Sequence, residues 1–318
     1  MMTLEEFLED WHSSSETILV HTSGSTGNPK PLMVEKRKML NSAKITCDFL
    51  DLKPGNTALL CMSLDYIAGK MMVVRSLERG LRLLQVKPSG HPLAEVPLDR
   101  PIDFAAMVPM QVYNSLQVPA ERERLRRIKH LIIGGGAIDD KLASELQSFP
   151  HAVWSTYGMT ETLSHIALRR INGPTASEWY EPFEYVRVDT NEEGCLVIDA
   201  PLVCSEKLVT HDIAEIKDGK FRIKGRKDNV ICSGGIKIQI EEVEDILRTI
   251  LLSPFMLVKK KDEKFGEVAV LITEDSDLQR VESICRQRLP KYWIPKEYLH
   301  FEQLPLTETG KPKRAILL

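Results

Sequence analysis

The sequence lacks the features by which several classes of protein are recognised. None of its six cysteines belongs to a Cys-x-x-Cys pair, which argues against a zinc site and against a dense disulfide framework. The amino terminus, MMTLEEFLEDWHSSSE, has neither the basic start nor the apolar core of a signal peptide, and no apolar run approaches the length that spans a bilayer. We therefore expect a cytoplasmic protein with reduced thiols and no membrane partner.

An excess of basic charge is also absent. The formal net charge is −3 at pH 7, so nothing global predicts nucleic acid or an anionic membrane as a partner. Two local basic clusters, at residues 122–130 and 259–265, are interrupted by acidic or apolar residues, which favours a solvated helix face or loop over a binding surface. A composition of 43% hydrophobic and 27% charged residues in a chain of 318 is that of a globular protein with room for two domains.

Helices and strands are predicted to alternate through the first part of the chain. The residue patterns predict helices at 4–11, 35–52, 66–80, 109–117 and 141–149, and strands at 17–20, 32–34, 57–63, 81–86, 103–108, 130–136 and 151–158. This order predicts an α/β fold with a mostly parallel sheet, in which ligands bind beyond the carboxyl ends of the strands. Glycine-rich segments at 23–27 and 134–136 follow two of these strands, and Gly158 closes a third.

The pattern changes from about residue 183 onward. Short strands with turn residues between them follow, including the hairpin signal Asp218-Gly219. We predict a large domain over residues 1–225, of which 183–225 is mostly β, and a small α+β domain over residues 226–318.

The segment ILVHTSGSTGNPK, residues 18–30, joins a short apolar strand to a loop of glycines and hydroxyl residues. Backbone N–H groups in such a loop form a nest for anions, the hydroxyls add donors, and Lys30 adds a positive charge. The spacing differs from the Walker pattern, because Asn28-Pro29 separates the last glycine from Lys30. The loop predicts a phosphate site, and a flexible linker is the disfavoured alternative.

Five further segments each have an ordinary explanation when taken alone. GGGA at 134–137 and STYGMTET at 155–162 could be turns, although Tyr157 offers a flat face to a base and Glu161 an oxygen ligand to a metal. Asp212 in THD could be a surface carboxylate or could accept from two ribose hydroxyls. The segment at 225–244 combines charges with a double glycine, and Lys311 in TETGKPKR would alone be read as a solvated lysine.

Together and in this order, TSGSTGNPK, GGGA, YGMTE, THD, GRKDNVICSGGIKI and TGKPKR resemble the adenylate-forming (AMP-binding) superfamily of acyl- and aryl-CoA ligases. The resemblance covers residues 17–314 and implies a large mixed- or parallel-sheet domain with a small, mobile α+β carboxyl-terminal domain. It implies a ligase that uses ATP, Mg²⁺ and CoA: a carboxylate attacks the α-phosphate of ATP, and a thiol then displaces AMP from the acyl adenylate.

The resemblance also implies a role for each matching residue. Lys311 would be catalytic, bridging the substrate carboxylate and the α-phosphate, and Asp228 would be the hinge between the domains. The other roles are phosphate binding by Thr22, Ser23, Gly24, Ser25, Thr26, Gly27 and Lys30; adenine and ribose binding by Gly134, Gly135, Gly136, Ala137, Tyr157, Gly158, Thr160, Asp212 and Arg226; metal binding by Glu161; and a CoA channel at Gly234, Gly235 and Lys237.

The sequence departs from the family at three places, the first of which is MSLDYIAGKMM, where many members have an aromatic-His element after the third strand. The phosphate loop begins at residue 22, whereas family members usually carry a long amino-terminal subdomain before it, so we expect a shortened form whose acid pocket has different walls. His211 stands where glycine is commoner.

Among subfamilies, LDYIAGKMMVVRSLERGL, YGMTETLSHIALR and KFGEVAVLI resemble the o-succinylbenzoate–CoA ligases of menaquinone biosynthesis. We place Tyr66, Gly69, Lys70 and His165 in the acid pocket. Lys70, His165 and Arg169 are candidates to bind the second carboxylate of such a substrate, and an ordinary structural histidine is the alternative for His165.

Three alternatives to this function remain open. The chain could be a CoA ligase for another aryl or short acyl acid, or an adenylation domain that loads a carrier protein. It could also be a non-catalytic nucleotide-binding protein with the same fold, although Lys311, Glu161 and Lys30 are all present. The sequence does not predict an oligomeric state.

Overall fold

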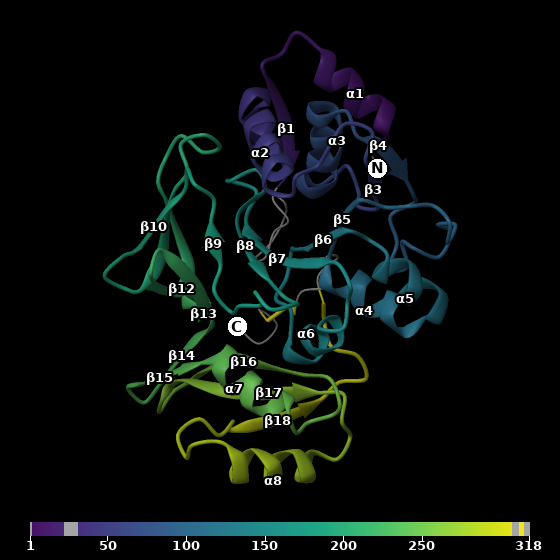
Figure 1. The fold of residues 1–318 in the computed structure, drawn as a ribbon. Coiled ribbons are helices and arrows are strands. Elements are labelled where there is room, and N and C mark those ends of the chain that lie inside the picture. Colours follow the sequence, from purple (N-terminus) through teal and green to yellow (C-terminus); the bar gives the residue numbers. More distant parts are fainter. Residues whose placement is uncertain (1, 22–30, 307–311, 315–318) are drawn as a thin grey trace. The chain divides into compact units, whose positions relative to one another are not determined.

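The computed structural model describes residues 2–21, 31–306 and 312–314 (Figure 1). The chain divides into two compact units, each described by itself. The first comprises Met1–Val188, Ile198–Leu208 and Lys217–Phe221, and the second comprises Asp189–Val197, Val209–Ile216 and Arg222–Leu318. The predicted domain boundary at residue 226 falls inside the longest stretch of the second unit and stays a prediction.

A seven-stranded mixed sheet organises the first unit. Its order is β4 (Arg82–Gln85), β3 (Thr57–Leu60), β5 (Phe104–Met107), β6 (His130–Ile133), β7 (Ala152–Gly158), β8 (His165–Arg170) and β9 (Glu181–Pro182). The pairs from β4 to β7 are parallel, and β8 and β9 add antiparallel pairs. All four residues of β5 are buried, as expected for a strand covered on both faces. The predicted α/β fold with a large mixed sheet is confirmed.

Helices flank this sheet, and all but the one at Pro119–Arg126 lie where the residue patterns predict a helix; the helices predicted at 35–52 and 141–149 end three residues earlier than predicted. They are α1 (Leu4–His12), α2 (Lys36–Phe49), α3 (Ile67–Arg79), α4 (Pro109–Gln117), α5 (Pro119–Arg126) and α6 (Asp140–Leu146). In Figure 1, α2 and α3 pack side by side. Gly80 ends α3 in the left-handed conformation, with φ 65° and ψ 40°, which confirms it as the predicted terminator. Asp139 caps α6 by accepting a hydrogen bond from the Leu142 N–H.

The strand before the phosphate loop differs from the prediction. The strands β1 (Thr17–His21) and β2 (Pro31–Glu35) pair with each other, antiparallel, as a separate two-stranded sheet. The loop 22–30 therefore connects the two strands of a hairpin and does not follow a strand of the main sheet. The prediction placed this strand in the main sheet because of its apolar residues. A partly buried strand of a small separate sheet can have the same composition, so composition alone does not distinguish the two.

A second sheet of four strands has the order β10 (Arg187–Thr190), β11 (Cys195–Asp199), β12 (Leu208–Lys217) and β13 (Lys220–Arg226). Asp218 and Gly219 join β12 to β13 with φ of 51° and 75°. Two residues with positive φ form the hairpin turn that this dipeptide predicts.

The second unit contains a mixed sheet with two helices. Its order is β15 (Ile236–Gln239), β14 (Val230–Ser233), β17 (Gly266–Thr273) and β16 (Phe255–Asp262), and β18 (Glu297–His300) pairs with β17. The helices are α7 (Ile240–Arg248) and α8 (Leu278–Arg288), and a short 3-10 helix spans Lys227–Asn229. Apolar residues of both helices and the sheet form one buried core, which includes Val243, Leu257 and Cys285.

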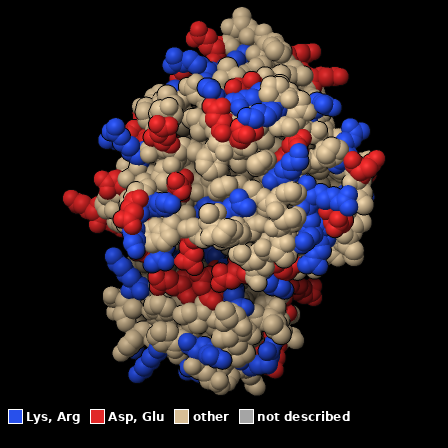
Figure 2. All heavy atoms as spheres, viewed as in Figure 1, with Lys and Arg blue, Asp and Glu red and all other residues tan. Residues whose placement is uncertain are grey.

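The two basic clusters lie on ordinary surface elements. Part of the first belongs to α5 and the residue after it, where Arg127 pairs with Glu123, and part of the second is β16, where Lys260 pairs with Glu297. On the face drawn in Figure 2, lysine and arginine side chains are interspersed with aspartate and glutamate. This arrangement favours the solvated surface that the sequence indicates.

Candidate functional site

One edge of the main sheet holds two of the predicted nucleotide-binding segments. Since β6 and β7 are neighbouring parallel strands, with Ile133 opposite Ser155, the residues that follow them lie at the same edge. Gly134–Ala137 leaves β6, and Gly135, Gly136 and Ala137 are exposed. Tyr157 and Gly158 end β7, and Thr160 follows in a buried position. The structure thus brings GGGA and YGMTE together at the place where α/β sheets bind ligands.

Two glycines at this edge lie too close to neighbouring atoms to carry a side chain. A Cβ on Gly134 would lie 2.3 Å from Thr156 Oγ1. A Cβ on Gly158 would lie 2.2 Å from the Ser164 carbonyl oxygen and 2.5 Å from His165 Cα. These glycines therefore let the loops fold close to the strands and leave backbone groups open at the edge.

The predicted adenine-binding Tyr157 is held by other aromatic rings. Its ring centroid lies 5.0 Å from that of Phe221, edge to face, and 5.8 Å from that of Tyr180. The Tyr180 hydroxyl is 2.8 Å from the Oγ of Ser155, which precedes Tyr157 on the same strand. These contacts fix the ring of Tyr157 at the edge of the sheet.

A tight turn presents the predicted metal ligand Glu161. Thr162 Oγ1 accepts from the Met159 N–H at 3.0 Å and lies 2.8 Å from the Ser164 carbonyl oxygen, to which it can donate. Leu163 has φ 64°, a strained conformation for a side chain of its size. The buried hydroxyl and this backbone turn leave Glu161 exposed.

The predicted ribose-binding residues form an ion-pair group in the second unit. Arg226 Nη1 donates to Asp212 Oδ1 at 3.0 Å, and Nη2 donates to Asp228 Oδ2 at 2.9 Å. His211 Nδ1 lies 2.8 and 2.9 Å from the two carboxylate oxygens of Asp228. Partial burial acts to raise the pKa of Asp228, but hydrogen bonds from His211 and Arg226 outweigh it and hold that pKa below its usual value. The predicted hinge residue is thus bonded to the residue that departs from the family pattern.

The predicted CoA-channel residues lie on one hairpin. Gly234 and Gly235 connect β14 to β15 with φ of 57° and 84°. The Gly234 N–H donates to the Phe265 carbonyl at 2.8 Å, and Lys237 is exposed on β15. A Cβ on Gly235 would meet nothing within 4 Å, so its positive φ, and not crowding, favours glycine there.

Three predicted acid-pocket residues lie at the start of α3. Tyr66 is the amino-terminal cap residue of this helix, and a Cβ on Gly69 would lie 2.3 Å from the Ser63 carbonyl oxygen. Lys70 is 2% exposed and donates to the Leu19 carbonyl at 2.8 Å. Burial lowers the pKa of Lys70, and the carboxylates of Asp10 and Asp65 oppose this effect. Lys70 therefore links α3 to the β1–β2 hairpin.

His165 belongs to a buried polar group between α2, α3 and β8. Thr46 Oγ1 lies 3.1 Å from His165 Nε2, and Ser164 Oγ lies 3.2 Å from His165 Nδ1. Burial, with a contribution from the nearby guanidinium of Arg75, lowers the pKa of His165 well below its usual value, so this histidine is neutral. Arg169 lies elsewhere on β8, where its guanidinium covers the ring of Tyr180 at 5.4 Å.

Arg75 completes this group and is a residue that the sequence-based prediction missed. It is 2% exposed, Nη2 donates to Ser164 Oγ, and Nε has no hydrogen-bond partner among the described residues. Burial lowers the pKa of Arg75 to about 10. A buried guanidinium is normally paired with a carboxylate, yet no ion pair of Arg75 occurs in the described part of the chain.

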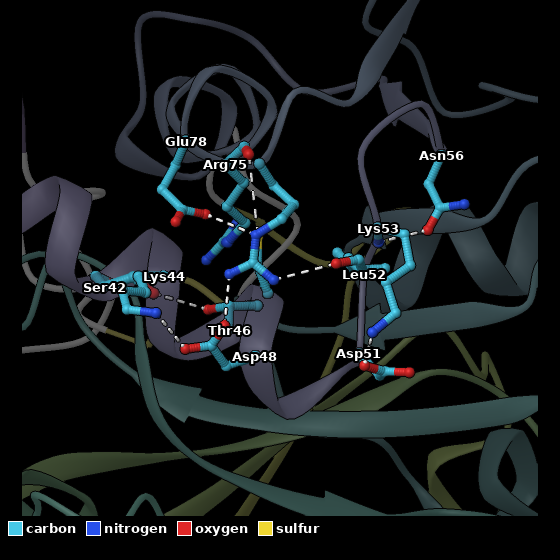
Figure 3. A network of polar contacts seen from close by, with 12 residues as sticks. Ser42, Lys44, Thr46, Asp48, Asp51, Leu52, Lys53, Asn56, Arg75 and Glu78 are labelled. Atoms are coloured by element: carbon cyan, nitrogen blue, oxygen red, sulfur yellow. Dashed lines mark hydrogen bonds and ion pairs between the residues drawn. The ribbon is translucent and has the colours of Figure 1, made fainter.

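Two carboxylates on α2 and α3, those of Asp48 and Glu78, are already bound by other cations. Figure 3 shows Glu78 and Asp48 near Arg75 in a network of polar contacts. Both are held by Arg79, one helical turn beyond Arg75, and Asp48 is also 2.8 Å from Lys44. A sequence signal for Arg75 was available, because the apolar Met71 and Met72 lie four and three positions before it, on the same face of α3. An arginine on an apolar helix face indicates a buried charge that needs a partner.

Two predicted parts of the site lie outside the described residues. These are the phosphate loop from Thr22 to Lys30 and the predicted catalytic Lys311. Their roles stay predictions.

The described residues fit the magnesium and nucleotide that the resemblance implies. No group of three or more His, Cys, Asp and Glu residues within residues 2–21, 31–306 and 312–314 could hold a metal alone. A single exposed carboxylate such as Glu161 suits Mg²⁺, which binds through one or two carboxylates together with substrate phosphates and water. The open edge lined by Gly134–Ala137 offers backbone groups to a nucleotide.

Comparison with known proteins supports the same class. The AMP-binding enzyme family matches residues 6–187, and the chain belongs to this family. An acyl-CoA synthetase (AMP-forming)/AMP-acid ligase II-like protein from Dyadobacter fermentans is 34% identical, with a TM-score of 0.67 over 98% of this chain and 91% of that one. The predicted membership in the adenylate-forming superfamily is confirmed.

Relatives of known activity are more distant and longer. The 2-succinylbenzoate–CoA ligase of Bacillus mycoides is 24% identical over 96% of this chain and 71% of its own length. A plipastatin synthase protein of Bacillus subtilis is 25% identical over 94% of this chain, which spans 13% of that protein. Among the described residues, no helix has the length and apolar character needed to cross a membrane.

Proposed function

We propose that the protein activates a carboxylic acid with ATP and transfers the acyl group to CoA. In the first step the carboxylate attacks the α-phosphate, forming an acyl adenylate and releasing pyrophosphate. In the second step the CoA thiolate attacks the acyl carbon, forming a thioester and releasing AMP. Family membership and the glycine-lined edge beyond β6 and β7 support this reaction.

Each part of the site has a role in this proposal. Thr22–Gly27 and Lys30 bind the β- and γ-phosphates, and Glu161 holds the magnesium that neutralises them. Gly134–Ala137, Tyr157, Gly158 and Thr160 line the adenine pocket, and Asp212 with Arg226 binds the ribose. Lys311 stabilises the charge that develops between the carboxylate and the α-phosphate. The second step uses a channel at Gly234, Gly235 and Lys237, after a rotation of the small domain about Asp228.

We propose o-succinylbenzoate, an aromatic dicarboxylic acid, as the substrate, which places the protein in menaquinone biosynthesis. One carboxylate of this acid is activated, and the other requires a cationic partner. Arg75 supplies a buried guanidinium with an unbonded Nε, and its neighbour Ser164 is half-buried. This observation carries the proposal, because a buried charge without a counter-ion is best explained by a ligand that brings one. The names of the 2-succinylbenzoate–CoA ligases among its relatives agree with this choice.

Substitution of Arg75 tests this assignment. The Arg75→Met variant keeps most of the volume of the side chain and removes the charge. We expect kcat/KM for o-succinylbenzoate to fall about ten- to a hundredfold, since a hydrogen bond to a charged group contributes about 1.5–3 kcal/mol. The two monoacids that lack one or the other carboxylate, 4-oxo-4-phenylbutanoate and 2-butyrylbenzoate, should be poor substrates of both proteins. The rate of pyrophosphate release gives kcat/KM for each of the three acids.

The matched control is Arg79→Met, which removes a guanidinium one helical turn away that is already paired with Asp48 and Glu78. It should leave the preference for the diacid unchanged. If Arg75→Met keeps the full preference, Arg75 is not the partner of the second carboxylate. If the wild-type protein prefers a monoacid, another acid is the substrate.

A further inference from the structure

The second unit contains a buried carboxylate with two charged partners. Glu244 on α7 is 2% exposed. Its Oε1 accepts from the Leu257 N–H at 2.8 Å and from Arg314 Nη1 at 2.6 Å, and its Oε2 accepts from Arg314 Nη2 at 2.9 Å. Arg248 Nη2 makes a longer contact with Oε2, at 3.4 Å. A two-point pair between guanidinium and carboxylate fixes direction as well as distance.

Arg314 is also bonded to the sheet of this unit. Its Nη1 donates to the Leu257 carbonyl at 2.6 Å. Leu257 lies on β16, is fully buried and belongs to the main core of the second unit. Arg314 therefore connects the carboxyl-terminal segment both to α7 and to β16.

A β-bridge lies in the same carboxyl-terminal segment, just before Arg314. Leu306 and Pro312 form an antiparallel bridge, and the Lys313 N–H donates to the Pro305 carbonyl at 2.9 Å. Residues 307–311 lie between the two bridged residues in the sequence, and this stretch contains Lys311. Lys311 is three residues from Arg314, a separation of at most about 11 Å along the chain. The bridge and the Arg314–Glu244 pair thus fix the segment that directly follows Lys311.

We propose that Arg314, held by Glu244, is a positioning residue for Lys311 in adenylate formation. The inference rests on the proposed function, in which Lys311 contacts the reacting groups only in the first step. A displacement of about 1 Å at a catalytic group can reduce the rate a hundredfold. A looser anchor would therefore slow adenylate formation and leave thioester formation unchanged, because the second step does not use Lys311.

Two variants and one control test this proposal on the full chain. Arg314→Lys keeps the charge but cannot bond at two points and to the Leu257 carbonyl together. Glu244→Met/Arg314→Met removes both charges, so that neither is left buried alone, and guards against a folding failure of the single variant. Arg248→Met removes the other guanidinium near Glu244 without touching the carboxyl-terminal segment.

The two half-reactions are measured separately, as acid-dependent ATP–pyrophosphate exchange and as thioester formation from synthetic acyl adenylate and CoA. For Arg314→Lys we expect kcat of the exchange to fall about ten- to a hundredfold, with KM for ATP and acid within about twofold of wild type and thioester formation unchanged. The double variant should likewise lose exchange activity and keep thioester formation. Arg248→Met should match wild type in both half-reactions. Equal loss in both half-reactions, or no loss in either, would overturn the proposal.

Hydrogen exchange of residues 305–314 gives a readout that does not depend on activity. We expect faster exchange there in both Arg314 variants, and unchanged exchange in α7 and β16 of Arg314→Lys. Unchanged exchange at 305–314 would contradict the anchoring role. A wild-type protein that activates no acid would contradict the proposed function alone, and the anchoring is then decided by the exchange measurement.

Discussion

At the scale of single residues, the buried group around His165 combines a neutral imidazole with a charged guanidinium. The hydroxyls of Thr46 and Ser164 lie within hydrogen-bond distance of the two ring nitrogens of His165. Arg75, on α3, donates a hydrogen bond to Ser164. Protonation of the imidazole would place a second positive charge beside Arg75 in a buried site. The group therefore favours binding of an anion, and a low pH, at which His165 would be protonated, would destabilise it.

This arrangement predicts how stability changes with pH. The folded-state pKa of His165 lies well below its usual value, so the unfolded chain takes up the proton first as the pH falls. The contribution of His165 to stability is thus constant above about pH 6.5 and is lost below it, by at most about 1.4 kcal/mol per pH unit. Denaturant unfolding between about pH 5 and pH 7.5 should show a smaller loss for His165→Gln than for wild type.

The control for this experiment is His300→Gln, which changes an exposed histidine at the end of β18. Its stability should follow the wild-type curve at every pH. A His165→Gln protein that loses as much stability as wild type on acidification would show that another group, such as the half-buried His130, dominates the effect.

The family pattern singled out residues that the structure brings close together, although their roles stay predictions. Gly134, Tyr157 and Gly158 were predicted for one nucleotide pocket, and the structure places them at one sheet edge. Arg75 lies in the segment LDYIAGKMMVVRSLERGL but was not singled out there, because only the structure shows that its guanidinium is buried and that the neighbouring carboxylates already have partners. Which charged side chains are already paired can be determined only from the packed structure.

At the scale of elements, the junction of β7 and β8 is the most constrained part of the candidate site. The register shifts between Tyr157 and Gly158, so the two strands approach closely where the chain leaves the sheet. The turn with Leu163 at φ 64° returns the chain within a few residues. The backbone of β8 leaves no room for a side chain at position 158.

The Gly158→Ala substitution tests this constraint. A Cβ at 2.2 Å from a carbonyl oxygen requires the strands to separate, and we expect a loss of about 1–3 kcal/mol in the free energy of unfolding. The thermal stabilisation by ATP should also decrease. In the control Gly136→Ala, the new Cβ would lie 3.5 Å from Pro109, an ordinary contact, and stability should change little. Equal stability of the two variants would show that the junction adapts without strain.

Elements were predicted well where local signals mark their ends. Gly80, Pro109 at the start of α4 and the Asp218-Gly219 turn each impose a backbone conformation by themselves. Composition could not predict the pairing of β1 with β2, or of β8 with β7, because it does not show which strands pair or to which sheet they belong. The strand β18 was overlooked for the same reason, since it is half-exposed and pairs at the edge of its sheet.

At the scale of the whole molecule, the residues proposed for one reaction come from both units of the chain. The sheet edge beyond β6 and β7 belongs to the first unit, and the Asp212–Arg226–Asp228 group and the Gly234-Gly235 hairpin belong to the second. The proposed hinge at Asp228 is bonded to His211 and Arg226, so its rotation would require these bonds to break or to move with it. The chain belongs to the AMP-binding enzyme family, and its substrate is the central proposal.

The most direct test is to incubate the wild-type protein with ATP, Mg²⁺, CoA and o-succinylbenzoate and to identify the products by mass spectrometry. We predict o-succinylbenzoyl-CoA with equal amounts of AMP and pyrophosphate, and no thioester when ATP is omitted. The formation of ADP in place of AMP, or the absence of any acid-dependent thioester across aromatic and aliphatic acids, would contradict the proposed function.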